Sequence, residues 1–69
     1  MSDQHFSILR LPETLRRTGL SRTKLYELQA AGEFPGSVKL SQHGNGVGWI
    51  ESEVTRWVQG RISERDCRL

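Results

Sequence analysis

The stretch that decides the fold runs from Leu20 to Pro35 and reads LSRTKLYELQAAGEFP. Ser21 is a good helix N-cap, because its hydroxyl can accept a hydrogen bond from an orphan amide of the first turn. Gly32 readily takes the left-handed conformation of a helix C-cap. The sequence therefore predicts a helix from Ser21 to Ala31. The residues at helical spacing that should face the core are Leu20, Leu25 and Leu28.

A shorter helix is predicted directly before this one, from about Pro12 to Thr18. Pro12 suits the first position of a helix, where its missing N–H costs nothing, and Leu15 should be the buried residue. Gly19 then ends the helix in a tight turn. Two short helices joined in this way, the second with basic and hydroxyl residues on its open face, are typical of a DNA-binding helix-turn-helix.

A small hairpin and a third helix are expected to follow. Val38–Ser41 alternates apolar and polar residues as a half-buried strand does, and Val47–Ile50 can pair with it. The residues between them are too rich in glycine and polar groups to be core, so they should form the tip of a small wing. The last helix starts near Glu51, with Trp57 and Val58 covering the core.

The predicted fold class is mainly α with a small β-hairpin, a winged helix-turn-helix in the order helix, helix, hairpin, helix. The domain should span residues 8–63, with Ile8–Leu11 as a short extended lead-in. Residues 1–7 are expected to be a flexible N-terminal tail and residues 64–69 a polar C-terminal tail. A chain of 69 residues buries only about 60% of the surface that it exposes when unfolded, so its core should be thin.

Composition argues against several classes of protein. No apolar run approaches the roughly 20 residues that span a bilayer, and the N-terminus lacks the pattern of a secretory signal, so we expect a cytoplasmic protein. Cys67 has no partner for a disulfide, and His5 and His43 stand alone, so no metal site is expected. No catalytic set or cofactor motif is recognisable, which predicts that the protein is not an enzyme.

The net charge is only +2, but its distribution is uneven. Residues 10–41 carry an excess of three positive charges, whereas the rest of the chain carries an excess of one negative charge. The positive excess therefore lies on the predicted helix pair and first strand, where a phosphate-binding surface needs it.

Twelve residues are candidates for DNA contact. They are Arg16 and Arg17 in the first helix, Ser21, Arg22, Thr23, Lys24, Tyr26 and Glu27 in the second, and Lys39, Gln42, His43 and Asn45 in the wing. Arg22 lies near the helix start, where it can make a bidentate contact to guanine O6 and N7. Thr23 and Tyr26 share its outward face and can bond phosphate or touch a thymine methyl. The alternative reading is an ordinary solvated face.

The other candidates also have a structural alternative. Arg16 and Arg17 can clamp phosphate, or they can complement the negative end of the first helix, and at least one of them should be structural. Lys39 should reach the DNA backbone, while a polar hairpin tip such as the one around His43 is often only solvated. Trp49 and Trp57 are expected in the core rather than stacked on bases.

The ordered set of motifs is similar to the AlpA family of phage-type regulators, small winged-helix proteins related to the MerR-like DNA-binding domain and to phage excisionases. The motifs are Leu20-Ser21-Arg22-Thr23, Leu25-Tyr26, Gly32-Glu33-Phe34-Pro35, Val38-Lys39-Leu40, Gly48-Trp49 and Glu53-Val54-x-x-Trp57-Val58. The resemblance covers about Leu9 to Ile62. It implies a DNA-binding regulator of a prophage or genomic island that controls integrase or excision functions or acts as an excisionase.

Carried over by position, the resemblance places the helix from Ser21 to Ala31 in the major groove and makes residues 42–46 the wing. The chain departs from the family pattern at two positions. Lys24 stands where Ser or Thr is common and should strengthen phosphate contact. Glu27 stands where a basic residue is frequent, and it either reads a cytosine amino group or turns away.

The partner implied by these features is double-stranded DNA. Because so small a reader binds weakly alone, we expect a homodimer or a cooperative array on repeated sites. The competing hypothesis is a protein-interaction module, whose last helix or exposed Phe34 docks on integrase or RNA polymerase.

Overall fold

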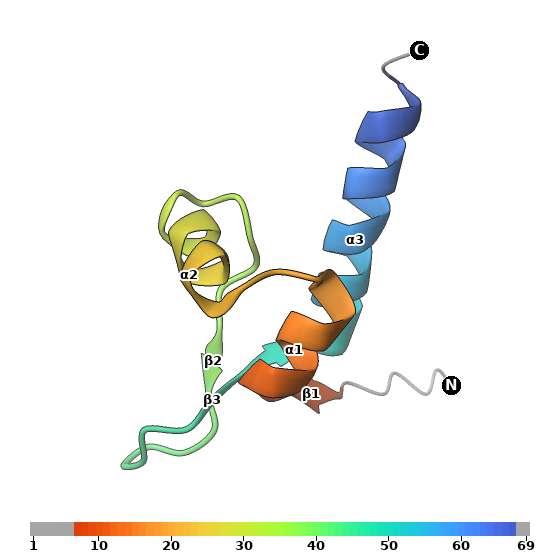
Figure 1. The fold of residues 1–69 in the computed structure, drawn as a ribbon. Coiled ribbons are helices and arrows are strands. Elements are labelled where there is room, and N and C mark those ends of the chain that lie inside the picture. Colours follow the sequence, from red (N-terminus) through yellow and green to blue (C-terminus); the bar gives the residue numbers. More distant parts are fainter. Residues whose placement is uncertain (1–6, 68–69) are drawn as a thin grey trace, which may run out of the picture.

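The computed structural model describes residues 7–67, so the tail predicted at residues 1–7 lies outside the described part except for Ser7, as do residues 68–69. The elements in chain order are β1 (Ile8–Leu9), α1 (Leu11–Thr18), α2 (Arg22–Ala30), β2 (Val38–Lys39), β3 (Val47–Ile50) and α3 (Glu51–Asp66). This order confirms the predicted fold of three helices with a small hairpin (Figure 1).

The sheet is larger than the predicted hairpin by one strand. Its order is β1-β3-β2 with both pairs antiparallel, so Ile8–Leu9 is a strand and not merely an extended lead-in. Gly48 in the central strand permits this close packing. A Cβ atom at Gly48 would overlap Ile8 Cγ2 and would lie 3.1 Å from the Leu9 carbonyl oxygen. A glycine at this position therefore lets β1 approach β3.

Helix α1 ends as predicted, but its fully buried residue is different. Gly19 closes the helix in the left-handed conformation with a φ of 75°. Thr14 has no exposed surface, whereas Leu15, the predicted core residue, is only half-buried against the core. Thr14 is tolerated there because its Oγ1 donates a hydrogen bond of 2.9 Å to the Arg10 carbonyl, which satisfies the polar group.

Helix α2 begins after the predicted cap residue Ser21 and ends just before the predicted Gly32. Ser21 Oγ accepts a hydrogen bond of 3.1 Å from the Lys24 amide, which confirms Ser21 as the N-cap. Gly32 has a φ of 78°, and the Glu33 amide after it donates to the Leu28 carbonyl at 2.8 Å. This bond satisfies an end carbonyl of the helix and turns the chain toward β2.

The core is small and centres on Trp49, which has no exposed surface. The buried apolar residues are Leu9, Leu25, Phe34, Trp49 and Val54. The Trp49 indole donates a hydrogen bond of 3.2 Å to Gln29 Oε1, so β3 is tied to α2 by a polar bond as well as by packing. Trp57 packs edge-on against Phe34 with ring centroids 5.0 Å apart, which places it over the core as predicted.

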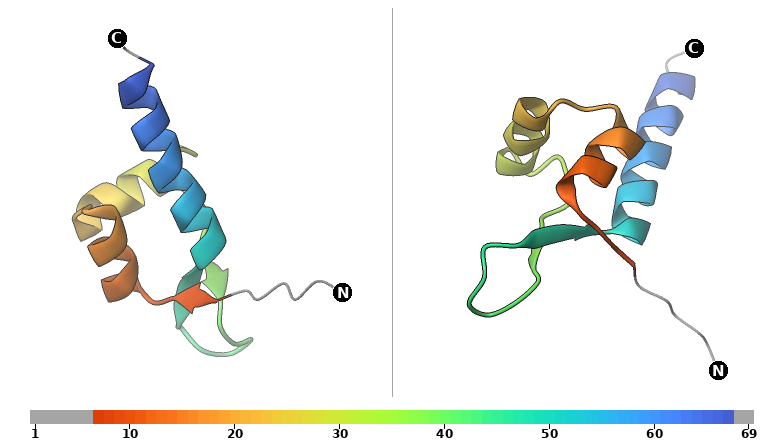
Figure 2. Two further views of the ribbon diagram at one scale, coloured as in Figure 1. Left: turned by 90° about the vertical axis from the view of Figure 1, so that its right-hand side faces the viewer. Right: turned by 60° about the horizontal axis from the view of Figure 1, so that its bottom comes forward.

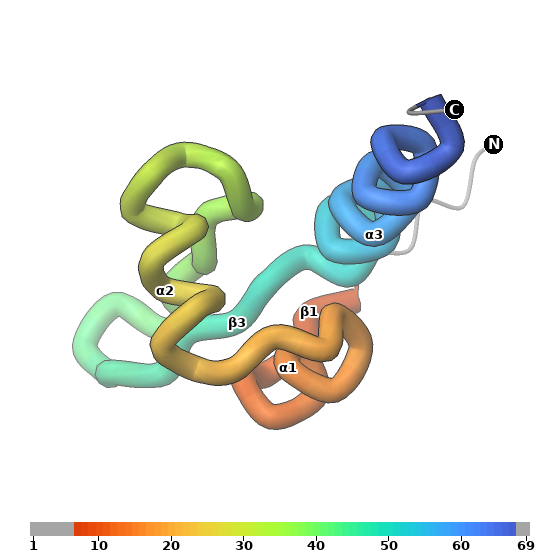
Figure 3. Tube along the Cα trace, turned by 45° about the horizontal axis from the view of Figure 1, so that its top comes forward, coloured from red at the N-terminus to blue at the C-terminus, as the bar shows by residue number. Residues whose placement is uncertain are grey.

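The elements form two sides of the molecule. Helix α2 and the β2–β3 hairpin lie on one side, α3 lies on the other, and α1 lies between them (Figures 1 and 3). Helix α3 continues to Asp66, beyond the domain boundary predicted at residue 63, and its second half projects past the other elements (Figure 2). Within residues 7–67, no helix combines the length and apolar character needed to cross a membrane.

Candidate nucleic-acid interface

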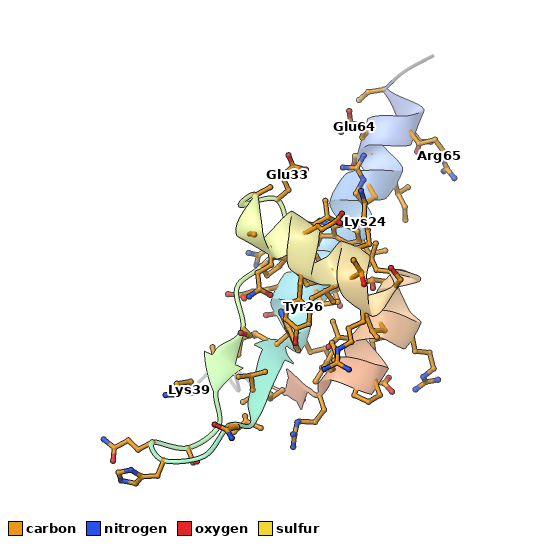
Figure 4. The ribbon with its side chains drawn as sticks, turned by 60° about the vertical axis from the view of Figure 1, so that its left-hand side comes forward. Lys24, Tyr26, Glu33, Lys39, Glu64 and Arg65 are labelled. Atoms are coloured by element: carbon orange, nitrogen blue, oxygen red, sulfur yellow. The ribbon has the colours of Figure 1, made fainter. Side chains whose placement is uncertain are left out.

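The candidate interface is the side of the molecule formed by α2 and the β2–β3 hairpin. Figure 4 views this side, with α2 across the front and Lys39 below it on β2. Tyr26 lies on the side of α2 that faces the strands, and Lys24 lies on the opposite side. The loop that closes the hairpin extends away from the helices (Figures 1 and 2). The helix and the hairpin can therefore meet one extended partner together.

Arg22 and Tyr26 occupy one edge of α2, since residues four apart are neighbours on a helix. The sequence predicted that the Tyr26 side chain points outward. Instead its ring partly faces the core, with its centroid 6.3 Å from that of Trp49 and the two ring planes tilted by 59°. The residue is still 40% exposed. Tyr26 is therefore held by the core on one side while part of its surface remains available beside Arg22. Thr23 lies on the exposed surface next to them.

Glu27 and Lys24 pair with each other across the exposed surface of α2. Their charged atoms are 3.9 Å apart, and both side chains are more than half exposed. An exposed pair of this kind contributes little stability, typically below about 1 kcal/mol. Its effect is electrostatic, since Glu27 supplies a local counter-charge to Lys24. Glu27, which departs from the family pattern, therefore has an ion-pair partner within its own helix.

Arg16 and Arg17 are engaged by carboxylates. Both bond Glu13 in the first turn of their own helix, and Arg17 Nη1 also bonds Glu51 Oε2 at 2.8 Å, which links α1 to the start of α3. The hydrogen bond from Arg16, then that from Arg17, lowers the pKa of Glu13 below its ordinary value. The bonds to Glu13 and Glu51 raise the pKa of Arg17. The sequence predicted a structural role for at least one of the two arginines, and both make contacts of this kind.

The hairpin presents its candidate residues to solvent. Lys39, Gln42, His43 and Asn45 are all exposed. The tip has a local hydrogen bond, because Ser41 Oγ accepts from the Gly44 amide at 2.9 Å. Lys39 lies in β2 opposite Val47, so the strand pairing fixes its backbone while its side chain stays exposed. The wing candidates are thus brought together on one hairpin, separate from the α2 candidates.

The cations fall into two groups by their partners. Within residues 7–67, five form ion pairs: Arg16, Arg17, Lys24, Arg61 and Arg65. Among the described residues, the cations without an acidic partner are Arg10, Arg22, Lys39 and Arg56. Arg10 was not predicted as a site residue. The signal that could have found it is an arginine at an N-cap position, where a short acceptor side chain is usual.

A second surface feature lies away from the wing. A groove of about 480 Å³ is bounded by residues 32–36, which connect α2 to β2, and by Glu53, Arg56 and Trp57 of α3. Its lining combines two aromatic side chains with two carboxylates and one guanidinium. Within residues 7–67, no three His, Cys, Asp or Glu side chains lie close enough together to hold a metal ion.

Comparison with known proteins identifies relatives over most of the chain. Residues 7–62 match the family described as "Prophage CP4-57 regulatory protein (AlpA)". An "Uncharacterized protein ORF88" of Enterobacteria phage P4 is 51% identical over 57 residues, which are 83% of this chain and 62% of that protein. The "DNA-binding transcriptional activator AlpA" of Escherichia coli K12 is 32% identical over 68 residues, 90% of this chain and 87% of that protein. The chain thus spans less than two thirds of the phage relative's length.

Proposed function

Because the chain belongs to the AlpA family of prophage regulatory proteins, we propose that it is a sequence-specific regulator of transcription that binds double-stranded DNA. The relative named as a DNA-binding transcriptional activator supports this assignment. The observation that carries it is the shared side of α2 and the hairpin, where Arg22 and Lys39 lack acidic partners within residues 7–67. The protein would act in the cytoplasm on DNA of a prophage or genomic island, where it controls integrase or excision functions or serves as an excisionase.

In this proposal α2 enters the major groove. Arg22 is in the first turn, so its guanidinium can reach a base edge and donate two hydrogen bonds to guanine O6 and N7. Thr23 and the exposed part of Tyr26 contact phosphate or a thymine methyl beside it. Ser21 fixes the position of the helix start through its cap. The rigid placement of α2 against Trp49 then aims these groups as a unit.

The hairpin supplies contacts to the DNA backbone. Lys39 neutralises a phosphate, and Gln42, His43 and Asn45 on the exposed tip bond phosphate or the edge of the minor groove. Lys24, Arg16 and Arg17 contribute by exchanging a carboxylate partner for a phosphate. A reader of this size binds repeated sites as a homodimer or a cooperative array, with centres about 10–10.5 bp apart or a multiple of that.

A mobility-shift titration on the DNA upstream of a neighbouring integrase gene tests the proposal. Wild-type protein should shift this duplex in preference to a duplex of scrambled sequence. Lys39→Gln should weaken binding to both duplexes by a similar factor and reduce the slope of log K against log salt by about 0.9, because one phosphate contact is lost. Arg61→Gln is the matched control, since Arg61 is paired with Glu64 on α3. No preferential shift at any salt concentration would exclude sequence-specific binding.

A second candidate function is docking on integrase or RNA polymerase. The groove between the α2–β2 connection and α3 favours it, because the half-buried Trp57 offers apolar surface there and Glu33, Glu53 and Arg56 add charged groups. Phe34, which the sequence-based form of this hypothesis expected to be exposed, is instead buried. Trp57→Ala should then reduce capture of purified integrase or polymerase even after nuclease treatment. Capture that disappears with nuclease would show that DNA alone joins the two proteins.

A further inference from the structure

We infer that Arg10 forms a second phosphate-binding site at the base of the hairpin, where it takes a backbone phosphate of duplex DNA beside the wing. The inference rests on the proposed function and adds a residue that neither the sequence motifs nor the comparisons assign. The Arg10 guanidinium lies against the hairpin although Arg10 precedes α1 in the chain.

The guanidinium is placed at the point where the hairpin loop becomes β3. Arg10 Nη2 lies 3.6 Å from the position that a Cβ atom would take at Gly46, and Leu40 on the other arm of the hairpin flanks the same position. Arg10 is exposed and has no acidic partner among the described residues. Its charge is therefore free to meet an external anion at the hairpin.

The order of the strands sets Arg10 and Lys39 on either side of β3. Lys39 in β2 is paired with Val47, and Leu9 in β1 is paired with Trp49. Extending the β1 register by one residue brings Arg10 beside Gly48. Two unpaired cations thus flank the same part of the central strand, near the base of the loop that carries the wing candidates. Because successive side chains along a strand point to opposite faces, Arg10 shares the face of Gly46 and Gly48 whereas Lys39 shares that of Val47, so the two charges lie on opposite faces at the base of the hairpin.

Local stability does not explain an arginine at this position. Arg10 is the N-cap of α1, and its side chain makes no capping hydrogen bond. Short acceptor side chains are preferred there, and a cation is unfavourable at the positive end of the helix dipole. Natural proteins break such local rules mainly at functional sites. An external phosphate accounts for Arg10, because it supplies the anionic partner that the guanidinium does not have within residues 7–67.

The backbone of Arg10 is held in place from the core side. Its carbonyl oxygen accepts two hydrogen bonds of 2.9 Å, one from the Thr14 amide and one from Thr14 Oγ1. Thr14 is fully buried, and the preceding Leu9 is buried and paired in the sheet. Fixing the root of the side chain on both sides reduces the entropy lost when the guanidinium orders on a phosphate. The buried threonine thus acts as a positioning residue for Arg10.

The test compares charge variants at Arg10 on a fluorescein-labelled duplex of mixed sequence, since a phosphate contact does not depend on the bases. Arg10→Gln should weaken binding by about five- to tenfold near 0.1 M salt and reduce the salt slope by about 0.9. Arg10→Asp should weaken binding further. The melting temperature of Arg10→Asp should equal or exceed that of wild type, because aspartate is a good N-cap. Arg56→Gln, which removes the unpaired cation of α3, is the matched control and should bind like wild type.

The outcomes distinguish failure of the Arg10 site from failure of the proposed DNA-binding function. A stable Arg10→Asp protein with weakened, less salt-dependent binding supports the site. Unchanged affinity of Arg10→Gln, an unchanged salt slope, or equal losses in Arg10→Gln and Arg56→Gln would overturn it while the wild type still binds. If the wild-type protein shows no salt-dependent binding to any duplex, the proposed function itself fails.

Discussion

Trp49→Ala is expected to unfold most of the domain at 25 °C. Trp49 is the largest fully buried side chain, and its ring contacts Tyr26 while its N–H bonds Gln29, so it holds β3 against α2. Truncation of a buried tryptophan costs about 3–5 kcal/mol of unfolding free energy. A domain of this length has in total only about 3–10 kcal/mol, and its thin core places it near the lower end, where one such loss removes most or all of the stability. Urea denaturation followed by far-UV circular dichroism measures the change.

Trp57→Ala is the matched control for this prediction. Trp57 is only half-buried, packs against Phe34 at the rim of the core and bonds the Glu33 carbonyl at 2.8 Å. Its loss should leave a folded protein with a lower urea midpoint. Equal destabilisation by the two substitutions would contradict the central place given to Trp49.

Arg22→Ala should abolish most of the preference for the specific site. A bidentate contact to guanine supplies about 1–3 kcal/mol of discrimination, which corresponds to about 5- to 150-fold in the ratio of specific to non-specific affinity. The site is first obtained by selection from a random duplex library with the wild-type protein. Competition titrations on that site and on a scrambled duplex then give the ratio for each variant.

Arg22→Lys separates base reading from charge. Lysine keeps the positive charge but lacks the planar fork that donates two parallel hydrogen bonds. We therefore expect its affinity for the scrambled duplex to stay near that of wild type while its preference for the selected site falls. Retention of full preference in both Arg22→Ala and Arg22→Lys would show that another residue reads the bases. Arg65→Ala, at a cation paired with Asp66 at the far end of α3, should leave the ratio unchanged.

The parts of the fold that local chemistry determines could be predicted from the sequence. Ser21 caps α2 and Gly32 ends it, as their side chains and allowed backbone angles indicate. Gly19 likewise marks the end of α1. These signals act within a few residues, so no knowledge of the tertiary structure is needed to interpret them.

One error arose where a distant segment decides the outcome. A two-residue strand such as β1 has no periodic pattern of its own, and it exists because β3 offers an open edge and Gly48 leaves room. A second error had a local cause: Thr14 took the buried place predicted for Leu15, since its hydroxyl donates to a carbonyl one turn earlier. A polar side chain that is satisfied in this way is not recognisable as core from hydropathy.

The sequence predicted where the candidate site lies, but it did not predict which of its charged side chains are paired. Sequence alone placed α2 and the hairpin as the open surface, and both lie on one side of the molecule. It did not indicate which cations have partners, because the contact of Arg17 with Glu51 joins residues 34 positions apart. The sequence also did not indicate that the Arg10 side chain lies beside the hairpin.

The internal ion pairs have a consequence for how the proposed regulator would search a genome. The carboxylates of Glu13, Glu27 and Glu51 compete with DNA phosphate for their paired cations, which weakens the attraction of these cations to any stretch of DNA. Non-specific sites outnumber a true site by about 10⁶–10⁹, so every general contact also strengthens the competitors. A surface with few free cations dissociates quickly from wrong sequences. Occupancy of the correct site would then depend mainly on base contacts and on neighbouring bound copies.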